Sequence, residues 1–118
     1  MKEKPKIPTE LEFSRAKQKM RKRLAEEADL KAAIFARLPE RVPCHDVWVW
    51  LSDDVCTVSF VFPNDADLER RGNESQALVE AAIKNASEYK GLKEFEIEYH
   101  SHEHVLKRFN GDYDQYFR

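Results

Sequence analysis

The stretch VWVWLSDDVCTVSFVF, residues 47–62, decides the fold of this chain. It consists of two segments rich in β-branched and aromatic residues, separated by Ser52-Asp53-Asp54, a run typical of turns. We therefore predict two antiparallel strands joined as a hairpin. Apolar residues fall on both faces of this hairpin, which indicates that it lies in the middle of a sheet or is covered on both sides.

The first strand separates its side chains into two sets, because successive residues of a strand point to opposite faces. One face carries Trp48 and Trp50, and the other carries Val47, Val49 and Leu51. The two tryptophans fit packing in the core against the N-terminal helix, which is the interpretation we favour. They also fit a binding surface, because Trp is enriched at the energetic centres of protein interfaces.

A long helix is predicted before the hairpin, over residues 10–38. Thr9 and Glu12 have the spacing of a capping box, and no Gly or Pro follows until Pro39. At about 1.5 Å per residue such a helix is roughly 43 Å long, whereas a domain of this size is only about 27 Å across. The helix must therefore project beyond the domain, break near residues 26–29, or pack on a second copy as a homo-oligomer. Its apolar stripe consists of Phe13, Ala16, Met20, Leu24, Ala28, Ala32 and Phe35, and it is widened toward the end by Leu30, Ile34 and Leu38.

The segments after the hairpin complete an α+β domain. Asn73 and Gln76 indicate a second helix that ends at Gly91, and KEFEIEYH, residues 93–100, alternates as a third strand. Because a helix connects the second and third strands, these two strands can be parallel. Ser101 and Asn110-Gly111 delimit a short C-terminal helix over residues 102–109, and the alternation in residues 112–118 permits a last strand. We expect a flexible N-terminus over residues 1–8 and a single two-layer domain over residues 9–118.

Composition limits the classes of function. The 118 residues fit one domain, and neither a secretory signal pattern nor an apolar run long enough for a membrane span is present. We therefore expect a cytoplasmic protein, bacterial by default, in which Cys44 and Cys56 are reduced thiols. The chain has only three glycines and lacks the phosphate-binding and nucleophile motifs of common enzymes. We expect a protein that is not an enzyme and needs no cofactor.

Our first hypothesis is a protein-binding module. Residues 24–118 carry nineteen acidic and eleven basic residues, and an acidic surface attracts basic partners. An inhibitor or immunity-type protein that neutralises a basic protein is the concrete form of this hypothesis. The candidate contact residues are Glu94, Glu96, Glu98, Glu103, Trp48 and Trp50.

The alternative hypothesis is nucleic-acid binding, because residues 1–23 carry nine Lys or Arg against three Glu. The order helix, strand, strand, helix, strand is similar to that of the KH-like domains of ribosome-associated factors, and this resemblance implies RNA binding. The sequence departs from the KH pattern, since the GXXG loop is replaced by ERRGNES at residues 69–75. The candidate phosphate contacts are Arg15, Lys19, Arg21, Lys22 and Arg23.

A third hypothesis is a metal site in EIEYHSHEH, residues 96–104, where His100, His102 and His104 recur at every second position. On one strand these rings would share a face and could bind Zn, Ni or Cu. If Ser101 caps a helix, however, His100 ends a strand while the other two enter the first helical turn. Residues two apart on a helix do not face each other. We favour this second interpretation, in which no metal is held.

Overall fold

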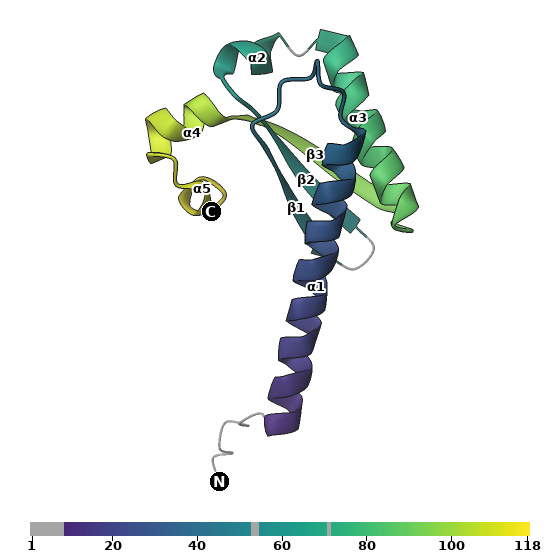
Figure 1. Ribbon diagram of the computed structural model, residues 1–118. Helices are drawn as coiled ribbons and strands as arrows, with labels where there is room; N and C mark the ends of the chain where they lie inside the picture. The colour runs from purple at the N-terminus through teal and green to yellow at the C-terminus, as the bar shows by residue number, and fades with distance from the viewer. Residues whose placement is uncertain (1–8, 53–54, 71) are drawn as a thin grey trace.

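The computed structural model describes residues 9–52, 55–70 and 72–118, and Figure 1 shows their arrangement. The predicted flexible N-terminus of residues 1–8 and the turn residues 53 and 54 lie outside these ranges. The elements are α1 (Glu10–Arg37), β1 (Asp46–Ser52), β2 (Val55–Phe62), α2 (Asp65–Glu69), α3 (Gly72–Tyr89), β3 (Glu94–Ser101), α4 (His102–Phe109) and α5 (Tyr113–Tyr116). The chain thus has the predicted α+β fold, with a long N-terminal helix and a central hairpin.

The described strands form one mixed sheet in the order β1-β2-β3. β1 and β2 are the predicted antiparallel hairpin, with Val49 opposite Val58. β3 pairs with the other edge of β2 in the parallel direction, and Ile97 lies opposite Val58. The helix α3 makes this parallel pairing possible, because it carries the chain back before β3 begins.

One face of the sheet is covered by α1 and α3, and the core lies between these two helices and the sheet (Figure 1). The side chains of β1 and β2 that point to this face are almost fully buried except for Leu51, which is partly buried. α3 meets them with its own small and branched residues. The main buried core residues are Leu30, Ile34, Val47, Val49, Cys56, Val58, Phe60, Phe62, Val79, Ile83 and Ala86.

The helix α1 is continuous and projects past the described sheet, and its N-terminal half approaches that sheet only near Lys19, Lys22 and Arg23, which line a hollow with Leu51 of β1 (Figure 1). Thr9 and Glu12 form the predicted capping box, and no break occurs near residues 26–29. Only Leu30 and Ile34 of this helix are buried. The longest dimension of the molecule is accordingly 63 Å.

Two local predictions are wrong. Residues 113–116 form the helix α5 instead of a last strand, because the Asp112 side chain accepts a hydrogen bond from the Gln115 amide and caps a helical turn. The helix α3 begins at Gly72, two residues earlier than an Asn73 cap requires, and the side chains of residues 72 and 73 lie outside the description. The other caps are as predicted: Ser101 precedes α4, and Asn110 ends it in the left-handed conformation.

Candidate functional site

The second face of the sheet carries neither α1 nor α3, and its residues are brought together by the strand register. Trp50, Thr57 and Glu96 form one row across the three strands. Trp48, Ser59 and Glu98 form the next row. Since neighbouring strands are about 4.8 Å apart, the backbones of the outer members of a row are separated by roughly 10 Å. We call this surface the open sheet face; it comprises Trp48, Trp50, Thr57, Ser59, Glu94, Glu96, Glu98 and His100.

The tryptophans do not pack against the long helix, so the interpretation favoured from the sequence is wrong. Val47 and Val49 take the positions toward α1 and α3, and the alternation along the strand turns Trp48 and Trp50 to the opposite side. The two indoles stack on each other with centroids 6.2 Å apart. Trp50 remains 38% exposed, and it is therefore the large apolar side chain that this face offers to solvent.

Aromatic residues of the C-terminal segment cover one end of the open sheet face. Tyr113 stacks on Trp48 at 5.3 Å between centroids. Phe117 contacts Trp48 at 5.5 Å and Trp50 at 4.9 Å. We call Tyr113, Tyr116 and Phe117 the C-terminal cover. Their spacing of three and four residues brings them to one side of a helical turn. This spacing indicates a helix, but we interpreted the segment as a strand.

His100 joins the sheet to this cover. Its Nδ1 lies 2.6 Å from the Tyr116 hydroxyl, and its Nε2 lies 3.2 Å from Ser59 Oγ and 3.4 Å from Glu98 Oε2. A neutral ring protonated on Nε2 satisfies these contacts, because it donates toward Glu98 and Ser59 and accepts from Tyr116. Burial lowers the pKa of His100, and the Glu98 carboxylate opposes this shift.

Serine, histidine and glutamate also occur together in nucleophilic active sites, so this cluster requires a chemical assessment. Ser59 is fully buried, and its hydroxyl donates to Glu98 at 3.3 Å. A nucleophile must reach a substrate carbonyl, and the hydroxyl of a residue with no solvent exposure cannot reach one in this conformation. The contacts of Ser59 instead orient Glu98 and His100 on the open sheet face.

The remaining histidines take separate positions. His102 stacks on His45 with centroids 3.6 Å apart, and its Nδ1 lies 2.6 Å from the Tyr113 hydroxyl. Burial lowers the pKa of His102, and the neighbouring His45 lowers it further. His104 lies at the edge of Phe109 and Tyr116. The predicted strand-to-helix junction is confirmed, and the described residues contain no group of three His, Cys, Asp or Glu side chains that could hold a metal ion.

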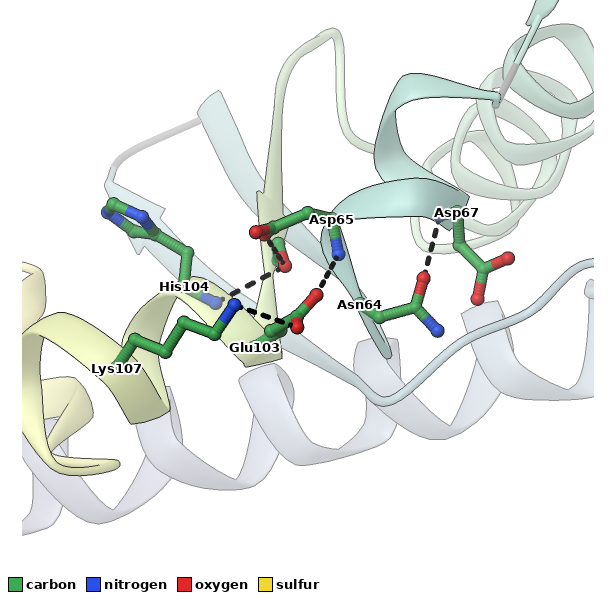
Figure 2. Close-up of polar contacts among 7 residues, drawn as sticks. Asn64, Asp65, Asp67, Glu103, His104 and Lys107 are labelled. Carbon is green, nitrogen blue, oxygen red and sulfur yellow. Dashed lines mark hydrogen bonds and ion pairs between the residues drawn. The ribbon is translucent and has the colours of Figure 1, made fainter.

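Glu103 does not belong to the acidic surface to which we assigned it. Figure 2 shows it between the first turns of α2 and α4, where its carboxylate accepts from the Asp65 amide at 3.0 Å and pairs with Lys107 at 3.0 Å. These two partners lower its pKa. The hydroxyl of Ser101 donates to the Asp65 carboxylate on the same junction. Glu103 therefore fastens two helix ends to each other, whereas Glu94, Glu96 and Glu98 stay exposed.

A polar hollow of about 320 Å³ lies beside this junction, at the carboxyl ends of β2 and β3. Two of its polar side chains already have partners, since Asp65 binds Ser101 and His100 binds Tyr116. These groups hold the C-terminal helices in place, which favours a structural network over a set of free ligand donors. The lining residues are Asp65, Leu68, Glu69, Tyr99, His100, Ser101, His104 and Tyr116.

The basic candidates lie on the projecting half of α1, which is separate from the open sheet face. Arg15, Lys19, Arg21, Lys22 and Arg23 are all exposed there. The structure thus places the two groups of predicted contact residues on separate elements. Sequence reasoning missed Ser59 and the C-terminal cover at the open sheet face, and it missed the stack of His45 on His102.

Comparison of the chain with known protein families, with curated proteins and with solved structures finds no match. Among the described residues, none of the helices combines the length and the apolar character that crossing a membrane requires.

Proposed function

We propose that this protein is a non-enzymatic binding module whose open sheet face takes a basic protein partner. The observation that carries the proposal is the row formed by Trp50, Thr57 and Glu96. It puts a half-exposed indole and a line of carboxylates on one surface. An exposed aromatic anchor with polar groups beside it is a frequent composition of a protein-binding site.

The charges on this face favour a basic partner. Glu94, Glu96 and Glu98 follow one another at every second position of β3, and all three are exposed. In the described residues β3 pairs only with β2, so its outer edge is open for contact. Complementary charge speeds the encounter, while burial of the indole supplies affinity. Inhibition of a basic protein, in the manner of an immunity protein, is the specific form that we propose.

A matched pair of variants tests this proposal. The chain, immobilised, is exposed to nuclease-treated lysate of its source cells, and the captured proteins are identified. We expect Glu94→Lys with Glu96→Lys to lose a basic protein that the wild type captures. The control, Glu80→Lys with Glu88→Lys, makes the same charge change on exposed positions of α3 and should retain that protein. Equal capture by both double variants would exclude the acidic strand as the contact surface.

Trp50→Ala then separates the anchor from the charges. If the indole is an anchor, its loss should weaken binding of the identified partner by about 30-fold or more, as is usual for an interface hot spot. The ionic-strength dependence of binding should stay unchanged, because no charge is removed. An affinity within about twofold of the wild type would show that Trp50 lies outside the contact.

A second candidate function is nucleic-acid binding by the projecting half of α1, which the exposure of its basic side chains favours. For a single strand, five phosphate contacts predict that the logarithm of affinity falls with the logarithm of salt concentration with a slope of about −3.5. Arg21→Glu with Lys22→Glu and Arg23→Glu should abolish binding to a labelled single-stranded RNA. Unchanged binding by this triple variant would eliminate the basic helix as the site.

A further inference from the structure

The projecting half of α1 exposes a row of large apolar side chains. Phe13 is 67% exposed, Met20 65% and Leu24 58%. Phe35, at the far end of the same stripe, is 40% exposed although it lies beside the domain. Of the apolar side of this helix the core takes Leu30 and Ile34, which widen the stripe toward its C-terminal end, and the rest of the stripe stays exposed. An apolar row of this length on a solvent-exposed helix is typical of an interaction surface.

The stripe is symmetric about Leu24. Phe13 and Phe35 stand eleven residues before and after it, Met20 and Ala28 stand four before and after it, and Ala16 and Ala32 stand eight before and after it. Two copies of α1 placed antiparallel, with their Leu24 residues on the two-fold axis, therefore bring each member of the stripe opposite its counterpart. A two-fold dimer requires a surface that is complementary to itself in this way.

The shape of the surface fits this arrangement. Phe13, Ala16, Lys17 and Met20 line a shallow hollow of about 360 Å³, and four residues with this spacing form the hole that receives a side chain of a facing helix. In the antiparallel register the segment of the partner copy that passes this hollow contains Phe35. A second hollow of about 170 Å³ lies beside Ala28, between α1 and β1, and Met20 of the partner copy would face it.

Charge selects the antiparallel direction. Residues 15–23 carry six basic side chains and no acidic one. Residues 25–33 carry Glu26, Glu27 and Asp29, and their single cation, Lys31, is paired with Asp46 at 3.0 Å. The antiparallel register lays the basic segment of each copy along the acidic segment of the other, with Arg21 opposite Glu27. A parallel pair would lay basic segment against basic segment, which is repulsive.

We infer that α1 is the dimerisation helix of this protein and that its occupant is α1 of a second copy, antiparallel and centred on Leu24. This inference does not rest on the proposed function, because the exposed indole of Trp50 and the carboxylates of β3 do not line the hollows assigned to the second copy, whereas Trp48 borders the one beside Ala28. Dimerisation would give the protein two open sheet faces.

Sedimentation equilibrium of the full chain tests the inference. We expect the wild type to have twice the monomer mass of 13.9 kDa. Leu24→Glu puts two carboxylates against each other on the axis and should raise the dissociation constant on the order of 100-fold. The control is Leu11→Glu, because Leu11 is 62% exposed on the opposite side of the same helix, and this variant should stay dimeric. Circular dichroism confirms that both variants are folded.

Direction is tested by oxidation of single-cysteine substitutions in a background where Cys44 and Cys56 are replaced by Ala and Val. Leu24→Cys should cross-link to itself in the antiparallel pair, whereas Phe13→Cys should not. Efficient cross-linking of Phe13→Cys would overturn the antiparallel register. A wild type that is monomeric at about 100 μM would overturn the inference. In that case, Leu24-dependent binding to phosphatidylserine vesicles would assign the stripe to a membrane surface, and Leu24-dependent binding to RNA would assign it to nucleic acid.

Discussion

Removing the Phe117 ring should lower the free energy of unfolding, because this ring packs in the C-terminal cover. Phe117 is half-buried, and its ring contacts Trp48 at 5.5 Å, Trp50 at 4.9 Å and His100 at 5.4 Å between centroids. Phe→Ala at a fully buried site costs about 3–5 kcal/mol. For a half-buried ring in an aromatic cluster we expect about 2 kcal/mol from Phe117→Ala.

Urea unfolding followed by tryptophan fluorescence measures this loss. With a slope of roughly 2 kcal/mol per molar urea, the midpoint should fall by about 1 M. The native emission should also shift to longer wavelength, because both indoles contact Phe117 and become more exposed. Tyr89→Ala, at a residue 71% exposed on α3, is the matched aromatic control and should change the midpoint little. A loss below about 0.5 kcal/mol for Phe117→Ala, with unchanged emission, would refute the packing of this segment on the open sheet face.

Three further outcomes follow from the titratable groups and the backbone. Folding lowers the pKa of His100 and His102 below the ordinary value of 6.5, so the unfolded chain binds more protons than the folded chain. Stability that is present at pH 7.5 should therefore be lost as the pH falls through 6.5. Thermal melts of a variant with Gln at both positions should show a weaker dependence of stability on pH in this range. Burial and Asp46 raise the pKa of Cys44 to about 11, so that about one molecule in 3,000 carries the thiolate at pH 7.5. A colorimetric disulfide reagent should therefore label this thiol at an ordinary rate only after denaturation. Gly111→Ala should lower the thermal stability more than Gly91→Ala does. Both glycines have positive φ, but only at Gly111 would the new Cβ contact a neighbour, a leucine methyl at 3.3 Å. Equal losses of stability in the two variants would exclude that contact as the cause.

The features that the sequence predicted well are those governed by local rules. The hairpin follows from two β-branched runs around a short turn, and the start of α1 follows from the capping box of Thr9 and Glu12. The histidine run could be divided correctly between strand and helix because Ser101 is a strong cap. In each case the determining residues lie within a few positions of one another, so tertiary structure had little to add.

The features that it predicted poorly depend on which of two apolar surfaces meets the core. Trp48 and Trp50 are as apolar as Val47 and Val49, and alternation alone does not say which pair faces α1. The stripe on α1 poses the same problem, since Leu30 and Ile34 lie beside it. The C-terminal cover was missed for another reason. A segment of only seven residues fits both the alternation of a strand and the spacing of a helical turn, and the cap at Asp112 selects the helix.

The position of β2 also has a consequence during synthesis. Its partner β1 is already made when β2 leaves the ribosome, but Val55 must wait for Glu94, 39 residues later, before its other edge is paired. At about 5–20 residues per second this interval lasts roughly 2–8 s. Throughout it the edge of β2 that β3 will occupy stays unpaired, and strands of neighbouring nascent chains can compete with β3 for that edge. The last third of the chain therefore pairs the second edge of β2 as well as supplying the C-terminal cover, and a stalled or truncated product would leave that edge of the central strand unpaired.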